Sequence, residues 1–488
     1  MSLAIKRSVF CWSIFFLLLI GLYGTVPHVY DLHVPLLGFL VFYLAQVFIP
    51  EARFDTKFLL RPKNIALFLF FLKIVVVPFT LIFFGNYVKT LPWIPSTHSM
   101  DIAICIEILA FICLIIGLKL NKKVRKTRDW NQHIKLDDHV PWRKLIIIMA
   151  ALGLIGFKLS FGSINEFLSY FLEPLRWVEL TSNKTSIQSF LGLILRPFLG
   201  YSVAYAWCRW IDKRSSKINL TVGLIVTLIA MALVAAASMD FNRASVFVPV
   251  LAIIGVFLAK IPKRRFLLGA LWFSFLIVII ILFANYRATV YSGAMPSRPN
   301  MSEEFLGLLQ NYFGAPQFLG FILEITDFGS TIFLGKTIIP SLMYPIPVFG
   351  KPFRSLSGPF IYNTWIYGLG LPSFDQILPN IGELFINFHL FGVLIGYIFL
   401  GVLLAYVEHL FNNSTQKGSV YIFTSTVIGY WIAQLIANTN LAITSQILFY
   451  KIWPIYTLYF FGRFYNSHDS VKGGSVLGRA RIFFKSSC

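Results

Sequence analysis

The sequence predicts an all-α polytopic membrane protein with about twelve transmembrane helices and one large, partly helical extracytoplasmic loop. Two features of the composition support this fold class. Of the 488 residues, 57% are hydrophobic and 13% are charged, whereas a soluble globular domain has about 25% charged residues. The 50 Phe residues add more apolar surface than a soluble fold of this length buries. We therefore expect the excess to face lipid.

Apolar runs long enough to cross the ~30 Å hydrocarbon core give the individual spans. They lie near 8–24, 33–49, 64–85, 101–120, 144–161, 188–208, 219–239, 244–260, 265–285, 381–407, 419–438 and 442–461. The first run follows two basic residues, as in a signal peptide, but no small-x-small cleavage site comes after it, so we expect an uncleaved helix. The chain thus divides into membrane helices within 1–285, a large loop at 286–380, further membrane helices within 381–461 and a tail at 462–488.

The basic residues set the expected orientation. Lys and Arg concentrate in alternate loops, with runs at 122–126 and 263–265, and cytoplasmic loops carry such an excess. Both termini are therefore expected in the cytoplasm. The preference for basic cytoplasmic loops during membrane insertion, together with anionic lipids, also accounts for the net charge of +21. The sequence has no basic groove pattern with interleaved aromatic residues, as nucleic-acid binding would need. The five cysteines have neither a disulfide nor a metal-ligand spacing.

Two outward connections are long, and long loops often carry function. The first, at about 162–187, begins with Ser163 and has Glu166 three residues later. This capping-box pattern, followed by apolar residues at helical spacing, predicts a short amphipathic helix on the outer membrane surface. Arg176 comes just after that helix.

The second long connection is the large loop at 286–380. A helix is expected to start at Ser302 and stop at Gly314, and another to cover 316–327. The stretch at 340–379 is rich in proline and aromatic residues, and we expect it to fold as a cap over the membrane domain. Its aromatic rings beside polar groups suit sugar rings; an aromatic belt at the membrane interface is the alternative interpretation.

Arginines on the outward side are the main chemical signal. Arg243 lies in a very short outer turn, and Arg196 lies within a span, about eight residues or ~12 Å from its outer end. A charge at that depth predicts a functional partner. Because Arg binds phosphate oxygens bidentately, such a set suits a pyrophosphate at the membrane surface; headgroup contacts or ion pairs are the alternative. The candidate pyrophosphate ligands are Arg196, Arg287, Arg298, Lys351, Arg354 and Arg176.

Other charged groups within spans also need an explanation. Glu383 opens the span after the large loop, where it could act as a general base or simply favour the helix N-terminus. His389 comes about one and a half turns later, and it is a candidate catalytic residue beside Glu383 and Arg243. Lys73 and Glu107, on neighbouring spans, are expected to neutralise each other. Lys451 lies near the middle of the last span, and the sequence does not indicate what it contacts.

The pattern resembles the Wzy-type oligosaccharide repeat-unit polymerases of bacterial surface polysaccharides. The likeness covers the whole architecture and rests in detail on three places: Arg243 before an apolar span, the stretch Ile339-Pro340-Ser341 to Gly350-Lys351-Pro352, and Gly382-Glu383-Leu384-Phe385-Ile386-Asn387-Phe388. Two positions depart from the family pattern. Ser341 stands where arginine is often found, a role that Arg354 could take instead, and His389 stands where glycine is usual.

The resemblance implies a GT-C-like membrane glycosyltransferase in the bacterial inner membrane. A growing glycan on undecaprenyl pyrophosphate would pass to a second undecaprenyl-pyrophosphate-linked oligosaccharide at the outer face. Arginines would hold the departing pyrophosphate, Glu383 is a candidate base, and neither a metal nor another cofactor is implied. Expected partners are membrane lipids, a chain-length regulator and a flippase, with no nucleic acid.

Three other functions remain as alternatives. An O-antigen ligase would share the architecture and the leaving group but use a different acceptor. A flippase or other transporter should show two similar halves and charges along many central spans, which this sequence lacks. A dolichol-type glycosyltransferase would place carboxylates in a long first outer loop, whereas here that loop is short and holds Asp31 alone.

Overall fold

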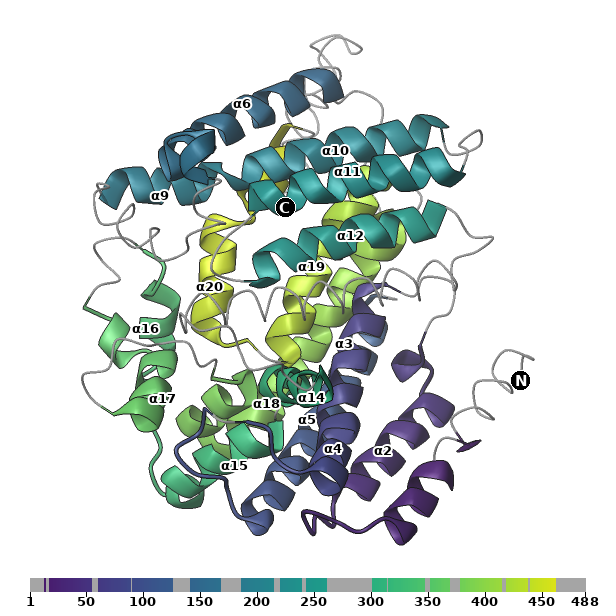
Figure 1. Cartoon of the computed structure of the whole chain (residues 1–488), viewed down its shortest axis with the longest axis vertical. Helices are drawn as coiled ribbons and strands as arrows, with labels where there is room; N and C mark the ends of the chain where they lie inside the picture. The colour runs from purple at the N-terminus through teal and green to yellow at the C-terminus, as the bar shows by residue number, and fades with distance from the viewer. Residues whose placement is uncertain are drawn as a thin grey trace, which may run out of the picture.

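The computed structural model describes a helical protein (Figure 1). The described residues are 13–14, 17–54, 60–88, 90–125, 141–167, 186–214, 220–238, 243–260, 301–313, 315–346, 352–368, 378–414, 418–437 and 439–461. No strand occurs among them. Seven of the described helices are long and apolar enough to cross a membrane. The chain is therefore an α-helical protein of the multi-pass membrane type.

The helices of the membrane part follow the apolar runs. They are α2 (Pro35–Phe48), α3 (Pro62–Phe71), the π-helix η2 (Leu72–Val76), α4 (Val77–Phe84), α5 (Thr97–Arg125), α6 (Trp142–Phe161), α9 (Ser186–Leu195), α10 (Pro197–Arg214), α11 (Leu220–Ser238), α12 (Arg243–Lys260), α18 (Asn380–Ser414), α19 (Ser419–Ala437) and α20 (Leu441–Tyr450). The expected first span is helical over 17–25. The expected span at 265–285 lies outside the described residues.

The large loop contributes helices of its own. These are α14 (Met301–Phe313), α15 (Ala315–Ile325), α16 (Ile338–Met343) and α17 (Gly358–Tyr367), with 3-10 turns η5 (Asp327–Gly329) and η6 (Arg354–Leu356). The two helices expected from the sequence are confirmed, although α15 ends two residues earlier than expected. Gln310 of α14 is fully buried, accepts a hydrogen bond from the Tyr87 N–H (2.7 Å) and donates one to the Gly85 carbonyl (2.9 Å). This part of the loop is thus docked on the membrane helices.

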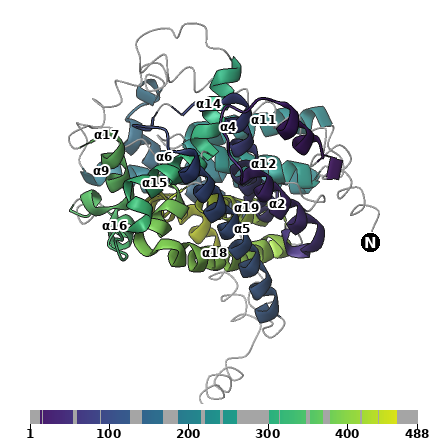
Figure 2. The same ribbon diagram turned by 90° about the horizontal axis from the view of Figure 1, so that it is seen from below.

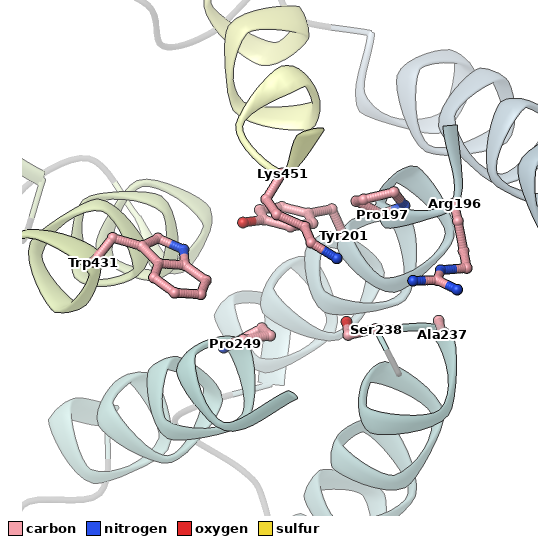
Figure 3. Close-up of a pocket in the computed structure, with 8 residues that line it drawn as sticks. All are labelled: Arg196, Pro197, Tyr201, Ala237, Ser238, Pro249, Trp431 and Lys451. Atoms are coloured by element: carbon pink, nitrogen blue, oxygen red, sulfur yellow. The ribbon is translucent and has the colours of Figure 1, made fainter. Parts of the chain in front are cut away.

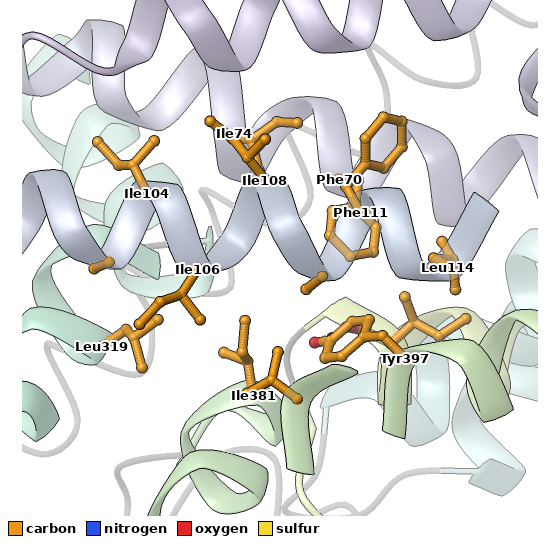
Figure 4. Packing of buried hydrophobic residues seen from close by; sticks show 14 of the residues in the cluster. Phe70, Ile74, Ile104, Ile106, Ile108, Phe111, Leu114, Leu319, Ile381 and Tyr397 are labelled. Carbon is orange, nitrogen blue, oxygen red and sulfur yellow. Dashed lines mark hydrogen bonds between the residues drawn. The ribbon is translucent and has the colours of Figure 1, made fainter. Parts of the chain in front are cut away.

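Buried apolar side chains form two cores. One joins α2, α3, α4 and α5 to α15, α17 and the first half of α18 (Figure 4). The other joins α6, α10, α11 and α12. Helices α18 and α19 contribute to both cores, so they link the two halves of the bundle. In Figures 1 and 2, α16 and α17 lie together at the edge of the molecule near α15, and α16 packs against α20. We call the face that carries α16 and α17 the loop face.

The most extensive contact among the described helices is the one between α5 and α18, and two glycines make it close. A Cβ on Gly117 would lie 2.1 Å from the Ile398 carbonyl oxygen, and one on Gly401 would lie 2.2 Å from the Leu114 carbonyl oxygen. Small residues at such crossings let membrane helices approach backbone to backbone. The α5–α18 pair is therefore closely packed along the part of α18 that follows Glu383 in the chain.

Several expected spans are interrupted rather than continuous. Pro78 lies two residues after the end of the π-helix η2, and because it has no N–H it cannot continue the regular hydrogen-bond ladder. Pro197 opens α10 after a break at Arg196. Within α18, Phe388 and His389 leave the helical conformation. Non-helical backbone at membrane depth is tolerated where protein or a cavity surrounds it. These breaks are therefore positions where functional groups can lie.

Candidate functional site

Two stretches far apart in the sequence meet at the start of α18. Ser341 of α16 donates a hydrogen bond from Oγ to Glu383 Oε1 (2.9 Å). One turn further along α18, the Asn387 side-chain amide donates to Thr337 Oγ1 (2.7 Å) and to the Glu383 carbonyl (2.7 Å). The four side chains Thr337, Ser341, Glu383 and Asn387 are all buried. The proline-rich part of the loop is therefore fixed directly onto the helix that carries Glu383.

The Glu383 carboxylate lies where several helices begin. Its Oε2 accepts a hydrogen bond from the backbone N–H of Leu441, the first residue of α20 (2.7 Å). Ser341 Oγ, which bonds the other oxygen, also accepts from the N–H of Gly358 at the start of α17 (3.4 Å). Glu383 itself is in the first turn of α18. Helix N-termini carry partial positive charge, so the carboxylate lies at the positive end of α20 as well as in the first turn of α18.

Access to Glu383 is narrow. Its residue surface is 3% exposed, and a Cβ on Gly358 would lie 2.9 Å from Oε1. Glycine at 358 therefore leaves room for the carboxylate on that side. With two donors in place, Glu383 acts as a helix cap in this structure. A substrate hydroxyl would have to replace the Ser341 hydroxyl to reach it.

His389 turns away from Glu383. Its Nε2–H donates to the Phe328 carbonyl (3.1 Å), and its ring packs on Phe385 with centroids 4.7 Å apart. The backbone of His389 has φ 56° and ψ −153°, a region that is essentially confined to glycine. A Cβ on Gly329 would lie 2.2 Å from the imidazole. His389 therefore locks the turn after α15 onto α18.

Arg354 lies on the loop face near the same helices. It is exposed, and its guanidinium carbon lies 5.4 Å from the centre of the Tyr344 ring. Tyr450, at the end of α20, donates its hydroxyl to the carbonyl of Pro345. Arg354 thus presents an accessible cation beside an aromatic ring and close to the end of α16.

Arg196 and Lys451 come together in a small cavity inside the bundle (Figure 3). Arg196 lies at the break between α9 and α10, is 2% exposed, and stacks over the Phe161 ring at 5.3 Å. Lys451 directly follows α20. The other lining residues are Pro197, Tyr201, Ala237, Ser238, Pro249 and Trp431. The surroundings of Lys451 could not be predicted from the sequence, and the fold places it in the same cavity as Arg196, directly after the end of α20.

The expected ion pair within the bundle is present. Lys73 Nζ lies 2.7 Å from Glu107 Oε1, and the two side chains are 2% and 1% exposed. Lys73 also donates to the carbonyl of Ala437, the last residue of α19 (2.9 Å). The expectation that the two charges neutralise each other is confirmed.

The remaining predicted site residues cannot be placed. Arg176, Arg287, Arg298 and Lys351 lie outside the described residues. Arg243 is the first residue of α12, and only its backbone is described. Within the described ranges, no group of three His, Cys, Asp or Glu side chains is arranged to hold a metal ion.

Two residues near Glu383 have a place in the site that the sequence did not assign to them. Asn387 stood out only as part of a motif, although its spacing of four residues from Glu383 predicts a shared helix face. Asn440 caps α20 by accepting from the Ile443 N–H (2.9 Å), and an Asn before an apolar run is an ordinary N-cap signal.

The site thus combines a buried carboxylate at converging helix N-termini, a cap of loop helices, and separate cationic groups at Arg354 and at Arg196 with Lys451. Cations of this kind can bind an anionic group, and a carboxylate is a group that can accept a proton. Searches of protein-family models, curated proteins and solved structures give no match for this chain.

Proposed function

We propose that this protein is a polymerase of the Wzy type, which joins undecaprenyl-pyrophosphate-linked oligosaccharide repeat units into a surface polysaccharide. The observation that carries the proposal is the contact between Ser341 and Glu383 (2.9 Å). These two residues belong to the two separate stretches on which the resemblance rests. Stretches that form one site are expected to lie together, and residues 42 positions apart in the chain have no local reason to do so.

The backbone at residue 389 gives independent support. The family motif has glycine at that position, and His389 adopts a conformation that is essentially confined to glycine. The shape of the chain after Glu383 therefore agrees with the motif even though the residue does not. The proposed architecture is that of a GT-C-like enzyme with about twelve spans, both termini in the cytoplasm and the loop face outside the bacterial inner membrane.

In the proposed reaction, an acceptor sugar hydroxyl transfers its proton to Glu383 while its oxygen bonds to the anomeric carbon of the donor glycan. The bond from that carbon to the pyrophosphate oxygen breaks, and undecaprenyl pyrophosphate leaves. Positioned cations stabilise the charge that develops on the leaving group. Arg354 and Arg243 are the proposed groups at the surface, and Arg196 with Lys451 would hold phosphate oxygens deeper in the bundle.

The test is a gel profile of the surface polysaccharide and its lipid-linked intermediates in the native host. The gene is deleted and then restored as wild type, Glu383→Gln, Arg243→Ala or Glu324→Gln. Glu324 is a matched control because its carboxylate is also in the large loop but lies outside the proposed site. It accepts hydrogen bonds from the Trp93 indole and the Ser96 backbone N–H. We expect long chains to vanish on deletion, single repeat units to remain on the acceptor, and only wild type and Glu324→Gln to restore the long chains.

Other outcomes would point to the alternatives. If single units also fail to reach the acceptor and lipid-linked polymer accumulates outside, the protein is a ligase. If lipid-linked units stay on the cytoplasmic face, it is a flippase, and the proposed reaction is wrong.

A further inference from the structure

The connection between α19 and α20 is held by charged side chains at both of its ends. At one end, the Lys73 ammonium donates to the carbonyl of Ala437, the last residue of α19 (2.9 Å). At the other end, the Glu383 carboxylate accepts from the N–H of Leu441, the first residue of α20 (2.7 Å). A cation at a helix C-terminus and an anion at a helix N-terminus both match the helix dipole. Only residues 438–440 separate the two contacts.

Lys73 is itself held firmly in place. It lies in the π-helix η2 and pairs with Glu107 of α5 at 2.7 Å. Its neighbours Phe70 and Ile74, with Ile106, Ile108 and other apolar side chains near Glu107, fill the surrounding core (Figure 4). Because a buried charge without its partner is strongly unfavourable, Lys73 cannot leave Glu107 for another position. Its contact with Ala437 is therefore set by η2 and α5.

The end of α19 has further contacts that hold it in place. Tyr397 of α18 donates its hydroxyl to the Ile436 carbonyl (2.9 Å), and the Thr439 N–H donates to the Gln434 carbonyl (2.9 Å). Asn440 donates to the Leu378 carbonyl (3.3 Å) and caps α20. The Leu441 N–H lies only a few residues after the end of α19, and Lys73 and Tyr397 bond the last carbonyls of that helix.

We infer that the Lys73–Glu107 pair is a positioning device for Glu383, acting through the end of α19 and the first N–H of α20. Glu107 fixes Lys73, Lys73 fixes the Ala437 carbonyl, and the short connection then places the Leu441 N–H against Glu383 Oε2. The hydrogen bond from Leu441 orients the carboxylate, so that its other oxygen faces Ser341. The inference rests on the proposed function only in naming Glu383 as the base.

The alternative is that the pair serves stability alone. The two explanations predict different activities for a protein from which both charges have been removed together. An apolar replacement of a buried ion pair keeps or raises stability when the volume is matched, so a purely structural pair can be replaced without loss of activity. A positioning pair cannot be replaced in this way without loss of activity, because the hydrogen bond from Lys73 to the Ala437 carbonyl is lost.

The test compares the double variant Lys73→Met/Glu107→Leu with the control Arg61→Met/Glu408→Leu in purified, detergent-solubilised full-length protein. Arg61 and Glu408 form another largely buried ion pair, which joins the residue before α3 to the second half of α18. Hydrogen–deuterium exchange over 437–445 measures the positioning directly. The kcat and KM for assembly of lipid-linked repeat units measure its consequence.

We expect the Lys73/Glu107 variant to exchange faster over 437–445 and to lose kcat by about 10- to 100-fold with KM nearly unchanged, since small misplacements of a catalytic group have effects of this size. In a Glu383→Gln background the same double change should have little further effect on kcat. The Arg61/Glu408 control should match wild type in both measurements. Unchanged exchange over 437–445, or an unchanged kcat in an active enzyme, would overturn the inference.

Two further outcomes keep the test decisive. If the double variant does not fold, Tyr397→Phe removes one hydroxyl at the same junction with almost no change of volume, and it should also speed exchange over 437–445; unchanged exchange would overturn the inference. If exchange responds as expected but the wild-type protein assembles no chains, the positioning stands and the proposed function fails.

Discussion

At the scale of single residues, Glu383 has an observed role as a helix cap and a proposed role as a base. Its two oxygens accept from Leu441 and Ser341, which is the geometry of a cap, and the proposed reaction makes the same carboxylate the base. A glutamine has the same shape and still offers one oxygen to the α20 N-terminus, whereas an alanine offers none. The two roles can therefore be separated by substitution.

We predict that Glu383→Gln abolishes chain assembly, with a loss of about 10²- to 10⁴-fold if the carboxylate is the base, while the thermal stability falls little. Glu383→Ala should in addition destabilise the protein by about 1–3 kcal/mol, because the N–H of the half-buried Leu441 loses its acceptor. Polysaccharide gels and thermal unfolding in detergent measure the two effects. Full activity of Glu383→Gln would rule out the base and leave only the cap.

His389 gives a prediction about the backbone alone. Because its φ of 56° with ψ of −153° suits glycine, His389→Gly should be more stable than His389→Ala by about 1 kcal/mol or more. Both variants lose the same ring contacts with Phe385 and Phe328, so their difference reports only the strain. Equal melting temperatures of the two variants would contradict the strained conformation.

At the scale of helices, the α5–α18 crossing depends on the absence of side chains. Gly117 and Gly401 face each other, and a Cβ on either one would lie 2.9 Å from the Cα of the other. Larger residues would force the two helices apart and, with them, the start of α18 that carries Glu383. The helix contact and the site thus lie on the same element, on opposite sides of the break at Phe388 and His389.

We predict that Gly401→Leu destabilises the protein by about 1–3 kcal/mol or more, as overpacking does in a tight interior. A leucine at Gly21, where nothing lies within 4 Å of an added Cβ, is the matched control and should have little effect. Thermal unfolding of the two detergent-solubilised variants distinguishes them, and similar melting temperatures would show that the crossing is looser than described.

The loop helices give a prediction about pH. Burial opposes ionisation of Glu324, but hydrogen bonds from the Ser96 backbone N–H and from the Trp93 indole outweigh it and hold the pKa of the carboxyl below its usual value. A lowered pKa in the folded state means that the group stabilises the fold above its unfolded pKa. That stabilisation is lost as the pH falls through the folded value.

We therefore expect wild type to lose more thermal stability than Glu324→Gln as the pH falls below the usual range of a glutamate. The difference between their melting temperatures, measured from neutral to acidic pH, should shrink. A difference that is constant with pH would contradict the ionised, hydrogen-bonded state of Glu324.

At the scale of the whole molecule, the orientation in the membrane can be tested without reference to function. Arg354 on the loop face and Lys213 near the end of α10 are both exposed. The positive-inside pattern predicts that they lie on opposite sides of the membrane. A protein whose five native cysteines are replaced provides the background for single cysteines at these positions.

We predict that a membrane-impermeant maleimide labels Arg354→Cys in intact spheroplasts and labels Lys213→Cys only after the membrane is opened. The sample with opened membranes is the control for reactivity at each site. Labelling of Lys213→Cys from outside would reverse the orientation and move the proposed site to the cytoplasm.

The sequence by itself determined the helical membrane class, the positions of most helices and two helices of the large loop. These depend on local properties: an apolar run of ~20 residues spans the hydrocarbon core wherever it occurs, and Ser302 and Gly314 are local signals that predicted a helix close to the observed α14, Met301–Phe313. The pairing of Lys73 with Glu107 was also predictable, since opposite charges on neighbouring spans have few other partners in an apolar interior.

Only the tertiary structure decided which groups surround Glu383. Its partners Ser341 and Leu441 lie 42 and 58 positions away in the chain, and no local pattern specifies a contact over such a distance. The same holds for Lys451 beside Arg196 and for Lys73 at the end of α19. Local sequence sets where a helix begins and ends, whereas the packing of one helix against another depends on the shapes of both, and the candidate site is made at those contacts.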